Sequence, residues 1–323
     1  MEETNTVKAS SLRWEILRRA FAGRRSPHLP EKQCQIGIKR ISRKAAQGFN
    51  LIPCRPINED GYEEGELGSS SLSKLNQLIG PRDACMRYTL PLCNAPSLVM
   101  IQRVENCVDL NEFEISNRFD IDNTGLVCHW PSENVLAYFC LSHADIFRSK
   151  KILELGSGYG LAGMVIAAST DASEVVISDG NPLVIDYIQR NIDANSRAFG
   201  DTKVKSMILH WNQEQGSNVP DTFDIIVASD CTFFKKFHEG LARTVKSLLK
   251  QSADSEAIFF SPKRGDSLSK FLEKVKEIGL QFGITENYDQ QVWKLHQRFS
   301  DGDNFWPNYE KDHCYPLLVR ITF

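Results

Sequence analysis

The chain has 323 residues, of which 41% are hydrophobic and 24% charged, and its formal net charge is -3. This composition is ordinary for a soluble globular protein, and the length suffices for one large domain with extensions or for two modest domains. No apolar run approaches the roughly 20 residues that a bilayer-spanning helix needs, and no secretory signal pattern opens the chain. Nine cysteines, none in a Cys-x-x-Cys pair, indicate reduced thiols and argue against a disulfide framework or a zinc site.

Charge is distributed unevenly along the chain. Residues 1–50 carry eleven Lys or Arg against four Glu, a net charge of +7, which leaves -10 for the other 273 residues. A basic arm at 1–34 on an acidic body would attract an acidic partner, nucleic acid or a membrane surface. A solvated, flexible tail is the alternative interpretation of the same residues.

The first 123 residues contain few regular patterns. One helix is expected at Ser11–Phe21, inside the basic arm. An N-terminal extension follows at 35–123, and within it the acidic, then Gly/Ser-rich stretch 58–74 is typical of a flexible linker. Two β-type runs separated by a turn predict a β-hairpin over 86–104.

From residue 124 to the end of the chain, apolar β-type runs alternate with amphipathic stretches. The expected strands are 151–155, 174–178, 205–210, 223–229 and 257–261. The expected helices are 132–147, 161–169, 181–198, 235–250 and 266–279. This alternation predicts an α/β domain over 124–323, with a Rossmann-like parallel sheet covered on both faces.

Two further runs close the chain, QVWKLHQRF at 291–299 and CYPLLVRITF at 314–323. No good helix is expected between them. We therefore expect them to form an antiparallel hairpin at the edge of the sheet. This ending differs from that of a plain dinucleotide-binding fold.

A cluster of glycines follows the first strand of this domain, in KILELGSGYGLAG. Gly158, Gly160 and Gly163 fit the dinucleotide pattern G-x-G-x-x-G, whereas Gly156, Gly158 and Gly160 fit the pattern that binds S-adenosylmethionine (SAM). Both patterns place a ligand at the carboxyl end of the strand, beside the first strand-to-helix turn. The glycines alone leave the choice of ligand open.

The residues around the glycines favour SAM. Glu154 would repel a pyrophosphate but suits a ligand that carries a sulfonium and an ammonium group. Asp179 ends the second strand, where an acid can accept both ribose hydroxyls, a spacing that also fits NAD and excludes only a 2′-phosphate. Gly180, Asn181 and Pro182 follow, with Asn181 a good N-cap and Pro182 a good first helical residue. The closing hairpin agrees, and no Walker sequence for a nucleoside triphosphate occurs.

The stretch 117–168 resembles the seven-β-strand protein-lysine methyltransferases of the family 16 type. The likeness resumes at VVISDGNPLVIDYIQRNIDAN (175–195), at DIIVASDCTFFKKFHEGL and at HCYPLLVRITF, and it covers roughly 86–323. It implies a seven-stranded SAM-dependent methyltransferase fold and methyl transfer to a lysine ε-amine. The first 80 residues carry little of the family pattern.

The resemblance also assigns residues to the site. The cofactor-binding positions that it implies, together with the residues argued above, are Trp130, Glu154, Gly156, Gly158, Gly160, Asp179, Gly180, Asn181, Trp211 and Ser229. Asp230 falls where the family faces the transferable methyl, although an N-cap role for it is the alternative. Asn212 replaces the glycine that usually follows the aromatic position of Trp211. Both tryptophans have core packing as their alternative interpretation.

Many relatives carry Asp-x-x-Tyr at the end of the fourth strand, whereas this chain has Asp230-Cys231-Thr232-Phe233, followed by Phe234. We expect Asp230, Phe233 and Phe234 to form the catalytic part of the site. A phenylalanine ring cannot bond an ammonium through a hydroxyl, but its face attracts a methylated ammonium by about 0.5–2 kcal/mol. The sequence therefore predicts retention of partly methylated lysine and a trimethylated product, with core packing of both rings as the alternative.

Methyl transfer needs no catalytic triad and no metal, and none is expected here. His238 is expected at the surface, and His210 is expected to have a structural role. The sequence lacks the Pro-Cys context of carbon methyltransferases and the Asn/Asp-Pro-Pro-aromatic pattern of base-methylating enzymes, which argues against nucleic-acid substrates.

Within the family, the likeness is strongest to the members that methylate calmodulin, so calmodulin is the implied protein substrate. A chaperone is a further possible partner, a monomer is expected, and the expected location is the cytoplasm, with the nucleus left open. Three alternatives remain. They are a methyltransferase acting on another protein or a small molecule, a SAM-binding protein without turnover, and a dinucleotide-dependent oxidoreductase.

Overall fold

The computed structural model describes residues 48–57, 75, 77–93, 95–104, 121, 123–127, 130–211 and 222–323. All of them belong to the second of the chain's two units, Ile41–Phe323. The expectations for 1–34, for Ser11–Phe21 and for 58–74 lie outside the described residues. Among the helices of the described ranges, none is both long enough and apolar enough to cross a membrane.

The principal sheet has seven strands in the order β6-β5-β4-β7-β8-β10-β9. The bounds are β4 (Lys151–Leu155), β5 (Glu174–Asp179), β6 (Lys203–Ile208), β7 (Ile225–Ser229), β8 (Glu256–Ser261), β9 (Gln281–Thr285) and β10 (Leu317–Thr322). Strands β4 to β8 pair parallel with their neighbours, whereas β10 runs antiparallel to both β8 and β9. This arrangement confirms the predicted α/β fold with a mostly parallel sheet and an antiparallel C-terminal pair.

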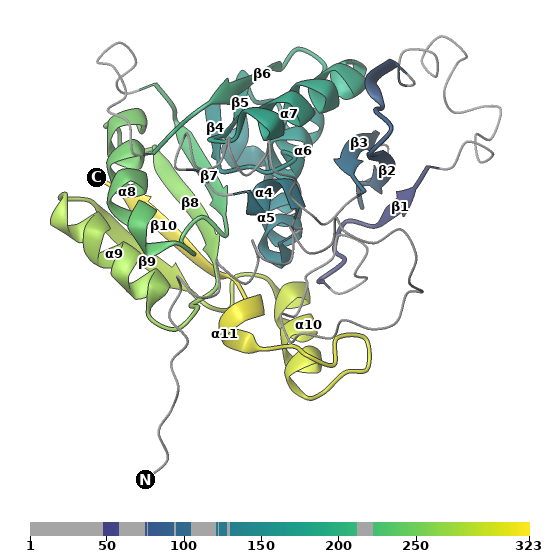
Figure 1. Ribbon diagram of the computed structural model, residues 1–323. Helices are drawn as coiled ribbons and strands as arrows, with labels where there is room; N and C mark the ends of the chain where they lie inside the picture. The colour runs from purple at the N-terminus through teal and green to yellow at the C-terminus, as the bar shows by residue number, and fades with distance from the viewer. Residues whose placement is uncertain are drawn as a thin grey trace, which may run out of the picture. The chain divides into compact units, whose positions relative to one another are not determined.

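Helices cover both faces of this sheet. Figure 1 shows α5, α6 and α7 on one side and α8 and α9 on the other. Their bounds are α5 (Pro131–Ser142), α6 (Leu161–Ser169), α7 (Pro182–Asn195), α8 (His238–Leu248) and α9 (Ser267–Glu277). The central strands are mostly apolar because both of their faces are buried.

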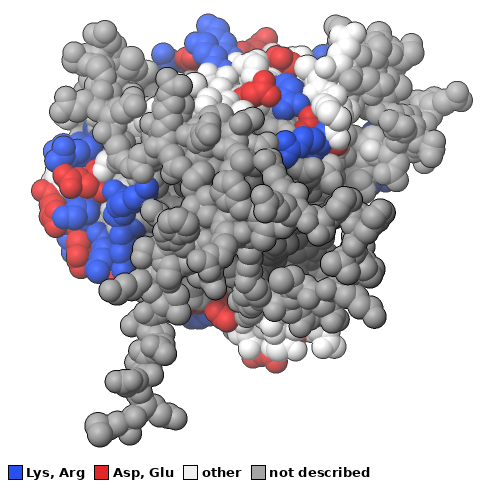
Figure 2. All heavy atoms as spheres, in the orientation of Figure 1, with Lys and Arg blue, Asp and Glu red and all other residues white. Residues whose placement is uncertain are grey.

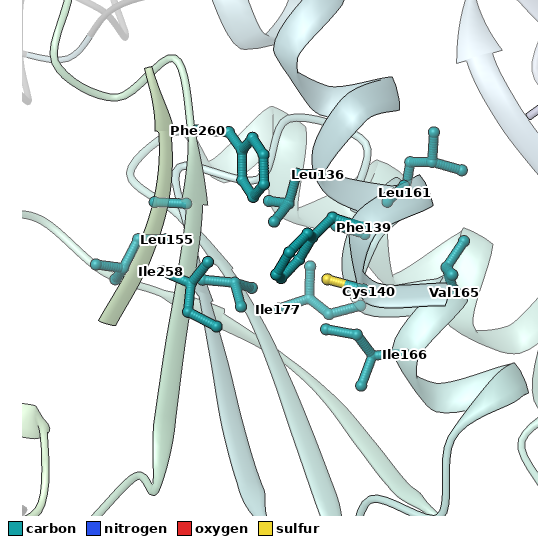
Figure 3. Close-up of a cluster of buried hydrophobic side chains, with 14 of the residues drawn as sticks. Leu136, Phe139, Cys140, Leu155, Leu161, Val165, Ile166, Ile177, Ile258 and Phe260 are labelled. Carbon is teal, nitrogen blue, oxygen red and sulfur yellow. The ribbon is translucent and has the colours of Figure 1, made fainter. Parts of the chain in front are cut away.

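The core beneath α5 and α6 illustrates this double coverage. Figure 3 shows side chains of the two helices meeting those of strands β4, β5 and β8. They are Leu136, Phe139, Cys140, Leu161, Val165 and Ile166 from the helices, and Leu155, Ile177, Ile258 and Phe260 from the strands. All ten are buried, so the central strands are held rigidly and their carboxyl ends have fixed positions.

A second sheet of three antiparallel strands, β1 (Cys54–Pro56), β2 (Asp83–Thr89) and β3 (Ser97–Arg103), lies against α7. Strands β2 and β3 form the hairpin that the sequence predicts over 86–104. Two asparagines of α7 bind the backbone of β3: Asn195 Oδ1 accepts from the Val99 N–H at 2.8 Å, and Asn191 Oδ1 from the Ile101 N–H at 2.6 Å. The side chains of α7 thus satisfy an otherwise open strand edge.

The predicted strand at 291–299 is wrong. That run lies in α10 (Gln290–Ser300), and β9 instead pairs with β10 at the edge of the sheet. Asp289 caps the helix by accepting from two backbone N–H groups, and Val292, His296 and Phe299 are buried on one face at helical spacing. Strand β9 lies at the sheet edge and is largely exposed, so its sequence carries little apolar signal.

Candidate functional site

A cavity of about 270 Å³ lies at the carboxyl ends of β4, β5 and β7. In the sheet order, the chain proceeds outward from β4 to β5 and β6, and from β7 to β8 on the other side. The cavity therefore lies at the point where the strand order reverses, which is where open α/β sheets bind ligands. Ten of the predicted site residues line it: Trp130, Gly156, Gly158, Asp179, Gly180, Trp211, Ser229, Asp230, Phe233 and Phe234.

The glycine turn after β4 forms one wall of the cavity. Gly156, Gly158 and Gly160 all have positive φ angles, of 55°, 57° and 81°. A Cβ added to Gly156 would lie 2.8 Å from Cys231 Sγ and 3.0 Å from the Trp211 ring. Glycine is therefore required there both by backbone conformation and by the close approach of two cavity-lining side chains.

Gly160 and Asn181, which the sequence also assigns to the cofactor, do not line the cavity. Gly160 is the N-cap residue of α6, and a Cβ there would meet Ile177 at 2.8 Å. Asn181 is the predicted N-cap of α7, and its side chain accepts from the Leu183 N–H at 3.0 Å. Both residues shape the turns that form the cavity.

Glu154 also lies outside the cavity lining, beneath the glycine turn. Its carboxylate is 1% exposed and accepts a hydrogen bond from the Gly163 N–H at 2.8 Å. Burial raises the pKa of Glu154 to about 8. In this structure, Glu154 therefore stabilises the start of α6 and fixes the turn from below.

Asp179, at the end of β5, holds the neighbouring turns in place. One carboxylate oxygen accepts from the Gly158 N–H at 3.1 Å and the other from the Asn181 N–H at 2.9 Å. Since a carboxylate oxygen can accept more than one hydrogen bond, Asp179 can still receive the hydroxyls of a ribose. The residue lines the cavity next to Gly180.

Five aromatic rings form a continuous series along the cavity: Trp130, Phe233, Phe234, Phe237 and Trp211. Successive ring centroids lie 6.0, 4.5, 6.2 and 6.1 Å apart. Phe233 is 38% exposed, so its ring is accessible at the cavity mouth. The series provides flat apolar faces that can stack on an adenine and exclude water.

Asp230, immediately after β7, has a partner that the sequence analysis did not identify. Its Oδ1 accepts a hydrogen bond from Arg264 at 2.6 Å, and both side chains are nearly buried. The only sequence signal for this pair is position, since Arg264 follows β8 as Asp230 follows the neighbouring strand β7.

Ten further residues line the cavity and were not among the predicted site residues. They are Ile121, Thr124, Gly125, Glu133, Ser157, Tyr159, Leu209, His210, Cys231 and Phe237.

The expectation for His238 is wrong. It is 3% exposed, its Nε2 lies 2.9 Å from the Thr232 carbonyl oxygen, and burial lowers its pKa. It begins α8 directly behind the loop that carries Phe233. His210, expected to be structural, lines the cavity, and burial lowers its pKa as well.

The donor set fits SAM. An acid able to bind a ribose lies beside a turn that requires glycine, and aromatic rings line the same cavity. Among the described residues, no group of three His, Cys, Asp or Glu side chains is arranged to bind a metal ion.

Comparison with known proteins places these features in context. Residues 112–278 match the model of a family described as lysine methyltransferase. Calmodulin-lysine N-methyltransferase of Arabidopsis thaliana is 59% identical over 322 residues, which is 100% of this chain and 99% of that protein. Protein-lysine methyltransferase METTL21E of Mus musculus is 30% identical, over 46% of this chain and 61% of its own length. Protein-lysine N-methyltransferase EEF2KMT of Mus musculus is 25% identical, over 49% and 50% respectively.

Proposed function

The chain belongs to the lysine methyltransferase family, and on that premise we propose that it transfers methyl groups from SAM to a lysine ε-amine of calmodulin. Family membership removes the dinucleotide-dependent oxidoreductase from the alternatives. The observation that carries the proposal is the convergence of the glycine turn, Asp179, Asp230 and the aromatic series on one cavity. The calmodulin substrate follows from the likeness to the Arabidopsis enzyme along the whole chain.

Each part of the cavity has a role in this reaction. When bound, SAM supplies a methyl group on a sulfonium, and its transfer to a neutral amine releases one proton. Asp179 would hold the ribose, and the glycine turn would let the cofactor approach the backbone. Asp230 would receive the lysine amine at the other end of the cavity.

The aromatic residues orient the amine and exclude water. A lysine has a reference pKa of about 10.4, and an apolar environment lowers it, which favours the neutral form that reacts. Phe233 and Phe234 lie at the cavity, so their rings can attract a partly methylated ammonium and retain it for another transfer. This supports the proposal that the product is trimethyl-lysine.

The product distribution tests that proposal. Phe233→Tyr and Phe234→Tyr each add a hydroxyl that can bond an ammonium, and we expect them to release more mono- and dimethylated product than the parent. Intact-mass spectra of the product provide the measurement. An unchanged distribution in both variants would leave the two rings with a packing role only.

Surface charge supports an acidic protein substrate. Residues 235–277 carry ten Lys or Arg against six Asp or Glu, although the whole chain is net negative. Figure 2 shows Lys and Arg side chains over the α8 and α9 side of the molecule, interspersed with acidic ones. Such a face raises the encounter rate with an acidic protein and makes it depend on salt.

Deletion of 1–34 tests whether the basic arm adds to this effect. If it does, turnover of the truncated protein should fall more at low salt than at high salt.

The direct test is the intact mass of unmodified calmodulin after incubation with the protein and SAM. We expect a gain of up to three methyl groups, and no gain with the Asp179→Ala variant. SAM binding without any gain in mass would reject calmodulin as the substrate. A comparison of methyl-lysine across a proteome would then identify the protein that is modified.

A further inference from the structure

The loop after β8 holds the loop after β7 at three points. Arg264 bonds Asp230, and Asp266 forms an ion pair with Lys235. Ser267 Oγ donates to the Thr232 carbonyl oxygen at 2.6 Å. The segment 263–267 thus supports the loop 230–235, which contributes residues to the cavity lining.

The Asp230–Arg264 pair lies in an unusual backbone setting. Asp230 has a φ of 54° and Arg264 a φ of 46°, so the loops that follow two adjacent strands each contain a left-handed residue that is not glycine. Such conformations persist when surrounding contacts fix them, and they cluster at functional sites. Here the fixing contact is the 2.6 Å ion pair between side chains that are 3% and 9% exposed.

The Arg264 guanidinium also contacts the aromatic wall. Its central carbon lies 4.7 Å from the Trp130 ring centroid and 4.9 Å from that of Phe233. Both rings line the cavity, whereas Arg264 lies outside its lining. The cation therefore fixes the carboxylate and two rings from behind, through ion pairing and cation–π attraction.

One oxygen of Asp230 remains available. Its Oδ2 is buried and accepts no hydrogen bond from any residue in the described part of the chain. Because an unsatisfied buried acceptor is costly, its presence at a cavity wall points to a donor that arrives with a ligand. A lysine amine is such a donor.

We propose that Arg264 is a positioning residue for methyl transfer, which holds Asp230 Oδ1 and the rings of Trp130 and Phe233 so that Asp230 Oδ2 receives a hydrogen of the substrate amine. The inference rests on the proposed function and adds a residue to its machinery. The substrate amine donates a hydrogen bond to Asp230 Oδ2. This bond orients the amine so that the nitrogen lone pair is directed toward the methyl group. Arg264 itself contacts neither substrate nor cofactor.

A double-mutant cycle tests whether Arg264 acts through Asp230. Arg264→Met and Asp230→Asn should each lower kcat/KM for calmodulin by about 100-fold, because a small misplacement of a reacting group has that effect. The double variant should lose no more than either single variant, since the two residues act as one unit. Arg264→Lys keeps the charge but loses the planar fork, so we expect an intermediate value. The loss in each variant should exceed any change in its affinity for SAM, since Asp179 and the glycine turn lie apart from the Asp230–Arg264 pair in the chain and stay unaltered.

The chain offers a matched control away from the site. Arg190 pairs with Asp83 at 2.6 Å and lies 4.1 Å from the Tyr187 ring, between α7 and β2. Arg190→Met should lower the Tm as Arg264→Met does, yet leave kcat/KM unchanged. Two results would overturn the inference. One is a double variant whose loss of kcat/KM equals the product of the two single losses, and the other is an equal loss of kcat/KM in Arg190→Met and Arg264→Met.

A substrate-free measurement separates this inference from the proposed function. In protein labelled with 5-fluorotryptophan, the Trp130 resonance is identified by its disappearance in Trp130→Phe. Asp230→Asn alone should shift that resonance toward its position in Arg264→Met, because the guanidinium loses its anchor. An unshifted resonance in Asp230→Asn would overturn the inference, whether or not calmodulin is methylated. A parent protein that adds no methyl to calmodulin would contradict the proposed function only.

Discussion

Two turns at the same edge of the sheet build this site in different ways. After β4, residues with positive φ are Gly156, Gly158 and Gly160. After β7 and β8, the residues with comparable angles are Asp230 and Arg264, which carry a Cβ and are held by their ion pair. The first turn, after β4, adopts these angles because its residues are glycines. The second turn, after β7, keeps them because Arg264 from the loop after β8 pairs with Asp230.

This difference explains what each turn can do. A turn of glycines adopts positive φ angles and brings the backbone close to a ligand. A turn held by side chains presents a carboxylate and aromatic rings whose positions depend on their neighbours. We therefore expect substitutions at the first turn to affect cofactor binding, and substitutions behind the second turn to affect transfer to the substrate.

The largest expected effect is at the glycine turn. Gly156→Ala should weaken SAM binding about 100-fold, because a Cβ there displaces Cys231 and Trp211. Gly200→Ala is the matched control, since Gly200 has a φ of 54° and no atom within 4 Å of an added Cβ. The control should lose about 1 kcal/mol of stability from left-handed strain and bind SAM normally. Calorimetric titration of both variants provides the measurement, and equal losses of affinity would remove the distinction between the turns.

Glu154, beneath the same turn, should make the stability depend on pH. Its pKa is raised from 4.5 to about 8, so its contribution is fully present below pH 4.5 and is lost as the pH rises through 8. The free energy of unfolding should fall by up to about 1.4 kcal/mol per pH unit within that window. Glu154→Gln stays neutral and keeps an acceptor for Gly163, so its urea-unfolding midpoint should fall less between pH 6 and pH 8. If the urea-unfolding midpoints of the parent and of Glu154→Gln changed equally with pH, this account of Glu154 would be contradicted.

The smallest expected effect is behind the second turn. Ser267→Ala removes the hydrogen bonds to the carbonyl oxygens of Thr232 and Phe233, at a cost of about 1 kcal/mol. We expect a few-fold loss of kcat with unchanged affinity for SAM. Steady-state kinetics and calorimetry together check this, and a loss of SAM affinity instead would indicate that the two turns are not independent.

The sequence predicts the first turn far better than the second, for a physical reason. Parallel strands, the cap at Asn181 and the glycines are local signals, and the strands lie within two residues of their predicted bounds. Arg264 and His238 act through contacts 34 and 6 residues away along the chain, which composition and spacing do not reveal. The helix at Gln290–Ser300 contains an apolar run that also fits a strand, and only the spacing of its buried residues is helical.

The most direct test of the account is a crystal structure of the protein with S-adenosylhomocysteine, the product left after methyl transfer. We predict that its ribose hydroxyls bind Asp179, that its chain passes the glycine turn, and that its sulfur faces the end of the cavity where Asp230 lies. Binding elsewhere, or in this cavity without contact to Asp179, would contradict the assignment of the cofactor to the first turn and of the lysine to the second.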